Sequence, residues 1–172
     1  RSGASRQQDR YRPLGRPEVL KVLQSQDMLP AITFIFSRAG CDGALYQCLR
    51  SRMVLTSQEE AQQIKDIVDA GVEGIPEEDL QVLDFKRWRE ALSRGFAAHH
   101  AGMLPAFRHI VEDLFVRGLV RAVFATETLA LGINMPARTV VLEKLIKFNG
   151  EAHVDLTPGQ YTQLTGRAGR RG

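Results

Sequence analysis

Short apolar runs alternate along the chain with stretches in which apolar residues recur at helical spacing. Four runs have little polar interruption, at 31–36, 96–99, 121–125 and 139–142. Such runs are typical of strands that lie buried on both faces of a parallel sheet. Helical spacing is found over 17–28, 39–52 and 105–117. The alternation predicts an α/β fold in three layers, with a mainly parallel sheet.

The interval between the first two predicted strands is longer than one crossover needs. A capping box at 57–60 predicts a helix that ends at Gly71. Pro76 opens a second helix, and its apolar stripe continues to Gly95. We expect these helices to form a two-helix insertion beside the sheet. Trp88 lies on the stripe, so we expect it in the core, and an exposed stacking platform is the alternative.

The two ends of the chain have patterns of their own. Residues 1–16 are polar, rich in arginine and without apolar periodicity, which predicts a flexible arm or linker ahead of one domain at 17–172. Near the other end, Asn149-Gly150 separates two strand-like runs. Because this dipeptide is a strong turn signal, a β-hairpin over 143–156 is expected.

The composition is that of an ordinary globular domain, with 172 residues, 44% hydrophobic and 25% charged. The arm has five arginines and one aspartate, so it carries +4 of a net charge of +3, and the remaining residues sum to −1. Any contact with nucleic acid must therefore be local. No apolar run of about 18 residues and no signal-peptide pattern occurs, so we expect a cytoplasmic location without membrane contact.

The cysteines and the adjacent histidines do not have the spacing of metal ligands. Cys41 and Cys48 are seven residues apart on a predicted helix, and we expect both to be small core residues. His99 and His100 should point to opposite sides of an extended segment, which makes them a poor metal-binding pair. No metal site is predicted.

The last residues of the chain carry a pattern with specific chemistry. Capping signals at 157–160 predict a helix from about Pro158 towards Arg170. One face of this helix would carry Gln163, Arg167 and Arg170. Guanidinium groups bind phosphate oxygens in pairs and neutralise charge on a γ-phosphate during phosphoryl transfer. We interpret Arg167 and Arg170 as candidate arginine fingers, and a basic surface helix is the alternative.

Four segments, in order, resemble the motifs of superfamily 2 helicases. Residues 31–38 (AITFIFSR) resemble motif IV, 99–102 (HHAG) motif IVa, 124–136 (FATETLALGINMP) motif V, and 163–172 (QLTGRAGRRG) motif VI. Together they resemble the second RecA-like lobe of the superkiller-type, DEVH-box RNA helicases, over residues 17–172. The resemblance implies a RecA-like fold of the P-loop NTPase type.

The resemblance also implies two sets of contacts. The backbone of a nucleic acid would be held by Ser37, Arg38, His100, Gly102, Thr126 and Thr128. ATP would be contacted by Gly132, Asn134, Gln163, Arg167 and Arg170. Because motif V belongs to both sets, it offers a route by which one ligand influences the other.

Local alternatives stay open for several of these residues. Arg38 is also compatible with a solvated loop arginine, Gly102 with a simple turn, and the two threonines of motif V with the cap of a short helical turn. In related helicases a hairpin between motifs V and VI separates strands. The hairpin predicted here has no exposed aromatic tip, so its role as a wedge is left open.

Part of a complete motor is absent from this sequence. No G-x-x-x-x-G-K-[ST] loop and no Asp-Glu-x-His motif occurs, so ATP and Mg²⁺ would be held mainly by a first RecA-like lobe that these residues do not include. We expect the C-terminal motor lobe of an ATP-dependent RNA helicase, inactive as an isolated fragment. The same lobe of a DNA helicase, or a non-catalytic module that binds RNA or protein, is the alternative.

Overall fold

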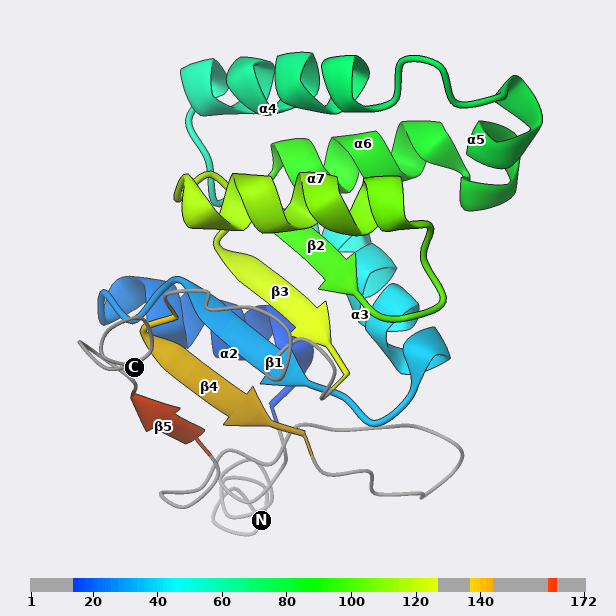
Figure 1. Ribbon diagram of the computed structural model, residues 1–172. Helices are drawn as coiled ribbons and strands as arrows, with labels where there is room; N and C mark the ends of the chain where they lie inside the picture. Colours follow the sequence, from blue (N-terminus) through cyan, green and yellow to red (C-terminus); the bar gives the residue numbers. More distant parts are fainter. Residues whose placement is uncertain (1–13, 127–136, 144–160, 164–172) are drawn as a thin grey trace, which may run out of the picture.

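The computed structural model describes residues 14–126, 137–143 and 161–163 (Figure 1). These residues form one sheet in the order β2-β3-β1-β4-β5. The strands are β1 (Ala31–Phe34), β2 (Phe96–His99), β3 (Ala122–Ala125), β4 (Thr139–Leu142) and β5 (Tyr161–Gln163). The first four strands are parallel, and β5 is antiparallel to β4. The prediction of a mainly parallel sheet is therefore confirmed.

Helices cover both faces of the sheet. They are α2 (Arg16–Ser25), α3 (Arg38–Arg50), α4 (Gln58–Gly71), α5 (Glu77–Leu83), α6 (Phe85–Ser93) and α7 (Pro105–Val116). The connection through α3 leads from β1 past β3 to β2, and α7 leads back from β2 to β3. Because such crossovers are right-handed, connections in opposite directions place their helices on opposite faces. The three-layer RecA-like architecture is confirmed, with α2 and α3 behind the sheet in Figure 1.

The insertion contains three helices, where the sequence pattern predicted two. Its capping box is as predicted, since Ser57 Oγ accepts from Glu60 N–H at 3.1 Å and Glu60 Oε1 accepts from Ser57 N–H at 2.9 Å. The helix predicted after Pro76, however, is divided into α5 and α6. Asp84 between them has φ 60°, a left-handed conformation that aspartate tolerates better than most residues. The apolar stripe could not predict this break, because apolar side chains pack on both sides of it.

The core extends from the sheet into the insertion. Trp88 on α6 is 2% exposed, and its ring lies 5.1 Å from that of Phe107 on α7, between centroids. Cys41 and Cys48 on α3 are fully buried. The core predictions for these three residues are confirmed, and burial rules out Trp88 as a stacking platform. None of the helices in the described residues has the length and apolarity needed to cross a membrane.

The helix predicted from Pro158 is wrong over the residues that the structure describes. Tyr161–Gln163 form β5, in which Tyr161 lies opposite Val141 and Gln163 opposite Thr139. The free edge of β4 offers a row of backbone partners, and tyrosine and threonine favour strands. An antiparallel edge strand on a parallel sheet is common. Tertiary pairing has therefore overridden the local capping signals, and Gln163 does not lie on the predicted helical face.

The folded region begins earlier than the sequence pattern indicated. Arg16, assigned to the arm, is the first residue of α2. Its guanidinium contacts both carboxylate oxygens of Glu143, with Nε donating to Oε2 at 2.7 Å, and Nη1 donates to Gln47 Oε1 at 2.9 Å. This ion pair fastens the start of α2 to the end of β4. Residues 1–13, and the predicted hairpin after Glu143, lie outside the described residues.

Candidate nucleic-acid interface

Most of the described candidates for backbone contact follow the carboxyl ends of neighbouring strands. In the register of the sheet, Phe34 of β1 and His99 of β2 both lie beside Ala125 of β3, so these strands end at one level. The residues that follow them therefore reach the same edge of the sheet. They are Ser37 and Arg38 after β1, His100 and Gly102 after β2, and Thr126 after β3. Open α/β sheets bind their ligands at this edge.

Ser37 joins β1 to α3 through a tight turn. It is the N-cap of α3, and its Oγ accepts from the N–H of Gly40 at 2.9 Å. A side chain on Gly40 would put a Cβ 2.7 Å from Ser37 Oγ and 2.7 Å from Ile35 Cγ2, so only glycine fits. Ser37 itself is exposed. Its hydroxyl hydrogen can still be donated to a ligand, because the cap uses only a lone pair of the oxygen.

Arg38 crosses from the β1 edge to the loop after β2. A Cβ placed on Gly102 would lie 3.2 Å from Arg38 Cδ and 3.2 Å from His100 Nδ1. Arg38 thus approaches Gly102, which is 64 residues further along the chain, and the missing side chain of Gly102 makes room for Arg38 and His100. In the part of the chain that the structure describes, no carboxylate forms an ion pair with Arg38. Arg38 is exposed, so with respect to the described residues its guanidinium can bind an anion.

His100 is held in one tautomer by two hydrogen bonds. Its Nδ1 accepts from the N–H of Gly102 at 3.1 Å, so Nε2 carries the proton and donates to Asp42 Oδ1 at 3.0 Å. The Gly102 amide is therefore already engaged, and a phosphate that used it would have to displace His100 Nδ1. His99 turns to α7, where its Nε2 lies 2.7 Å from Glu112 Oε2. The prediction that the two rings diverge is confirmed.

Asp42 is a residue of the site that the sequence analysis did not identify. It lies in the first turns of α3, and nothing in the pattern indicated that its carboxylate would meet a histidine 58 residues further along the chain. The contact forms only because α3 packs against β2. Its consequence is that α3 supplies both a residue of the turn after β1 and the group that orients His100.

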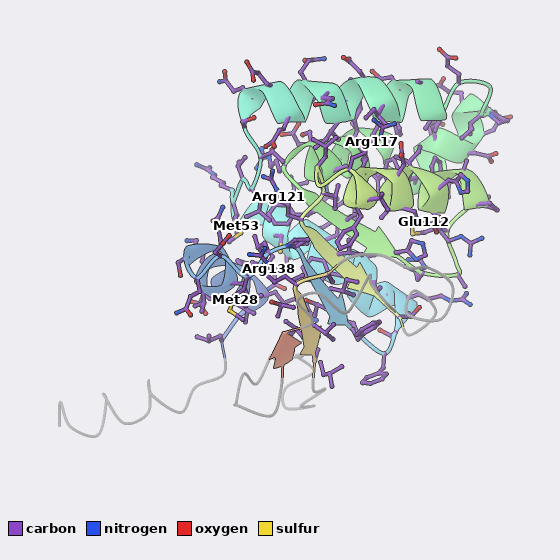
Figure 2. The ribbon with its side chains drawn as sticks, turned by 60° about the vertical axis from the view of Figure 1, so that its left-hand side comes forward. Met28, Met53, Glu112, Arg117, Arg121 and Arg138 are labelled. Atoms are coloured by element: carbon purple, nitrogen blue, oxygen red, sulfur yellow. The ribbon has the colours of Figure 1, made fainter. Side chains whose placement is uncertain are left out.

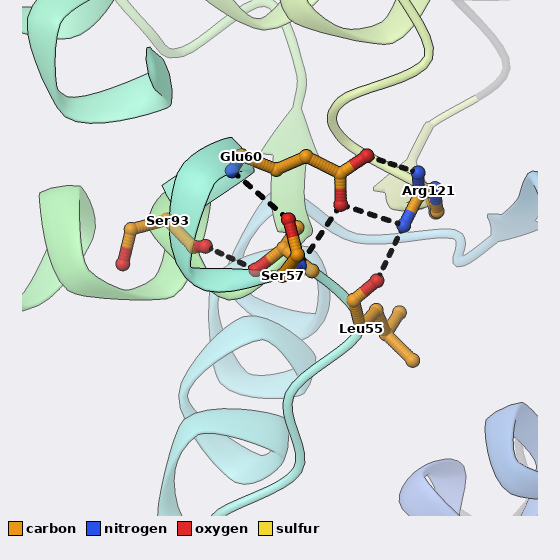
Figure 3. A network of polar contacts seen from close by, with 6 residues as sticks. Leu55, Ser57, Glu60, Ser93 and Arg121 are labelled. Carbon is orange, nitrogen blue, oxygen red and sulfur yellow. Dashed lines mark hydrogen bonds and ion pairs between the residues drawn. The ribbon is translucent and has the colours of Figure 1, made fainter. Parts of the chain in front are cut away.

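At the opposite end of the sheet, arginines have structural partners. Arg121 precedes β3, and it donates to the backbone oxygen of Leu55 at 2.6 Å and to Glu60 Oε2 at 2.7 Å (Figure 3). Arg138 precedes β4 and donates to the backbone oxygen of Asp27 at 2.7 Å. Figure 2 shows both arginines on the same side of the molecule. These two charges stabilise the fold, in contrast to the arginine at the carboxyl edge.

The same network affects the ionisation of Glu60. The backbone N–H of Ser57 and then the guanidinium of Arg121 hold the pKa of this carboxyl below its usual value, because both favour the charged form. Glu60 thus satisfies the first turn of α4 and also ties that helix to the start of β3 (Figure 3). The network fixes the insertion against the sheet, remote from the carboxyl edge.

The remaining candidates are not described by the structure. Thr128, Gly132, Asn134, Arg167 and Arg170 lie outside the described residues. Gln163 is described only through its backbone in β5. The structure therefore brings together five of the six predicted backbone-binding residues and leaves the predicted ATP contacts untested.

The three-layer α/β fold with its mainly parallel sheet is RecA-like, and hydroxyl, guanidinium and imidazole groups lie at its carboxyl edge. The chain belongs to the family of the helicase conserved C-terminal domain, whose model matches residues 77–172. This match confirms the helicase resemblance of the sequence motifs.

Three relatives show which kind of helicase this chain resembles. The chain is 68% identical over 162 residues to the probable helicase HelY of Mycobacterium tuberculosis, which covers 94% of this chain and 18% of HelY. It is 36% identical to the antiviral helicase SKI2 of Saccharomyces cerevisiae, over 91% of this chain and 12% of that protein. It is 47% identical to the DExH-box ATP-dependent RNA helicase DExH15 of Arabidopsis thaliana, over 87% and 12% respectively. The superkiller-type resemblance is thus confirmed, and the chain spans less than a fifth of each relative.

Proposed function

We propose that this chain is the C-terminal motor lobe of an ATP-dependent RNA helicase, which holds a nucleic-acid backbone along the carboxyl edge of its sheet. The observation that carries the proposal is the shared level at which β1, β2 and β3 end, which gathers Ser37, Arg38, His100, Gly102 and Thr126. Membership of the helicase family supports it. The relatives named above are themselves called helicases, and one of them an RNA helicase.

The chemistry of the edge suits a backbone. Arg38 offers a charged fork for phosphate oxygens, while Ser37 and Thr126 offer hydroxyl donors. These groups contact phosphate and sugar, which are the same in every nucleotide, so binding would be largely independent of sequence. His100 has both ring nitrogens engaged and acts mainly by shaping the turn at Gly102. Thr128, two residues after Thr126 in the sequence, would add a further hydroxyl donor.

The ATP contacts of the proposal rest on motifs V and VI. Arg167 and Arg170 would reach the γ-phosphate of an ATP whose triphosphate and Mg²⁺ are held by a first RecA-like lobe, since no Walker loop occurs in the 172 residues. Gly132, Asn134 and Gln163 would complete the nucleotide contacts. Thr128 and Gly132 are four residues apart in motif V, so nucleotide binding would shift the grip on the nucleic acid.

The finger role is tested in a protein that contains this lobe and a nucleotide-binding first lobe. Arg170→Ala is expected to lower ATP turnover by about 10³- to 10⁵-fold while ATP affinity changes only a few-fold, because a finger acts on the transition state. Arg171→Ala is the matched control, since this neighbouring arginine is neither a candidate finger nor one of the predicted ATP contacts. An equal loss of affinity and of rate would make Arg170 a ground-state ligand instead.

Two further measurements test the alternative functions, a DNA helicase lobe and a non-catalytic binding module. The isolated 172-residue chain should hydrolyse no ATP and bind RNA weakly and with strong salt dependence, and robust hydrolysis would contradict the need for a first lobe. Strand separation by the two-lobed protein, on matched RNA and DNA duplexes, distinguishes an RNA from a DNA helicase. If neither duplex is separated in an ATP-dependent way, the helicase proposal fails, and the alternative of a non-catalytic module that binds RNA or protein is favoured.

A further inference from the structure

Phe36 is an aromatic residue in an unusual position. It follows Ile35, which is buried and whose N–H still donates to Ala125 O of β3 at 2.9 Å, so Phe36 is the first residue beyond the pairing with that strand. Its side chain is nevertheless 66% exposed. Burial of a phenyl ring contributes about 1.5–3 kcal/mol, so a ring left in water contributes little of this to the fold. The exposed ring therefore lacks an explanation in the packing of the described residues.

A second exposed apolar side chain lies on the neighbouring strand. Leu142 is the last residue of β4 and is 47% exposed. It lies opposite Phe34 of β1 in the register of the sheet, and Phe34 is two residues before Phe36. Among the described residues, seven large apolar side chains are exposed, and Phe36 is the aromatic one. Two of the seven thus lie at the carboxyl ends of neighbouring strands, Leu142 as the last residue of β4 and Phe36 two residues after the end of β1. Isolated exposed apolar residues are ordinary, but a ring beside such donors is not explained in that way.

The ring belongs to the residue that directly precedes the polar groups, and all three residues are exposed. Phe36 precedes Ser37 and Arg38, and consecutive Cα atoms are about 3.8 Å apart. A phosphate gains nothing from a phenyl surface, whereas every nucleobase has a π-face that stacks on aromatic rings. An apolar ring next to a guanidinium and a hydroxyl therefore suits a nucleotide, with the base on the ring and the phosphate on the donors.

We propose that Phe36 is a stacking platform for an unpaired base of the strand whose backbone Ser37 and Arg38 hold. The inference rests on the proposed function and adds to it a preference for single-stranded nucleic acid. A base inside a duplex has both faces covered by its neighbours, so only an unpaired or terminal base can present a face to the ring. Stacking is tolerant of sequence, which agrees with a motor that moves along any strand.

The alternative partner of the exposed Phe36 ring is another protein domain. An apolar ring at the edge of a lobe would also pack against a neighbouring domain. Binding to a strand that lacks its bases separates the two, because such a strand keeps every phosphate and offers nothing to stack. The probes are therefore a fluorescently labelled oligouridine RNA and an abasic strand of equal length, both titrated with the 172-residue chain at low ionic strength.

Phe36→Ala is expected to weaken binding of oligouridine roughly 5- to 150-fold, the range covered by stacking of one base, and to leave binding of the abasic strand unchanged. Phe36→Leu keeps the apolar character and loses the ring, so it should resemble the alanine variant. Phe36→Trp should retain the affinity of the wild type, with a change in tryptophan fluorescence on binding. Val116→Ala is the matched control, since Val116 is 58% exposed and is the last residue of α7, which leads away from the carboxyl edge towards the start of β3.

A comparison of Arg38→Ala with Phe36→Ala distinguishes the stacking role of Phe36 from the backbone grip of the proposed function. Arg38→Ala should weaken binding of both strands and reduce the dependence of affinity on salt concentration, whereas Phe36→Ala should leave the salt dependence as it is. If Arg38→Ala weakens binding of both strands as expected, but Phe36→Ala and Phe36→Leu bind oligouridine as tightly as the wild type, the stacking platform is overturned and the backbone grip is not. Equal losses on both strands for these two variants also overturn the platform. No response of Arg38→Ala overturns the backbone grip itself.

Discussion

The ion pair between Arg16 and Glu143 allows a quantitative test of how this lobe is held together. The Glu143 side chain is 1% exposed and that of Arg16 13%, and the guanidinium contacts both carboxylate oxygens. Removing one partner of a buried pair leaves an unpaired buried charge, which costs about 3–5 kcal/mol. For a domain of this size, each kcal/mol shifts the melting temperature by about 2–4 °C. Arg16→Met should therefore lower the Tm of the 172-residue chain by about 6–20 °C.

Thermal unfolding followed by circular dichroism measures this shift. Arg117→Met is the matched control, because Arg117 pairs with Asp113 on the surface of α7, where both side chains are about half exposed. Exposed pairs contribute about 0–1 kcal/mol, so the control should lose at most about 4 °C. The double variant Arg16→Met/Glu143→Met should regain most of the loss, since apolar residues can replace a buried pair. A shift for Arg16→Met no larger than that of the control would refute the buried pair.

Two further predictions concern ionisation. The pKa of Glu60 is held below its ordinary value of 4.5 by Ser57 N–H and Arg121, so its contribution to stability is present above about pH 4.5 and is lost as the pH falls through the lowered folded value. Acid melting curves of Glu60→Gln should therefore depend less on pH in this range than those of the wild type, and identical pH dependence would contradict the assignment. Burial raises the pKa of Cys41 and of Cys48 to about 12, so a thiol reagent at neutral pH should label neither until the chain unfolds. Rapid labelling of the native chain would show that α3 opens.

The predicted elements that proved correct depend on local patterns. The apolar runs identified β2 and β4 with their observed bounds, and the helical spacing over 105–117 identified α7. The capping box of Ser57 and Glu60 was readable because its two members are three residues apart. Hydrophobic periodicity and capping act over one or two turns, so a single segment contains the whole signal.

The elements that were wrong depend on partners elsewhere in the chain. Tyr161–Gln163 became a strand because β4 has a free edge, and this edge exists only in the assembled sheet. The break at Asp84 depends on how α5 and α6 pack rather than on the stripe that both continue. Neither outcome has a signature within the segment that it changes.

For the candidate site, the sequence by itself determined which groups are present: the motifs placed a serine, an arginine, a histidine and a glycine after predicted strands. Only the tertiary structure decided that Arg38 lies against Gly102, that Asp42 orients His100, and that Phe36 remains in water at the same edge. The physical reason is that strand order and register are set by pairing between residues that are 91 apart in β1 and β3 and 108 apart in β1 and β4. Such pairing depends on the burial of the whole sheet, which no local pattern contains.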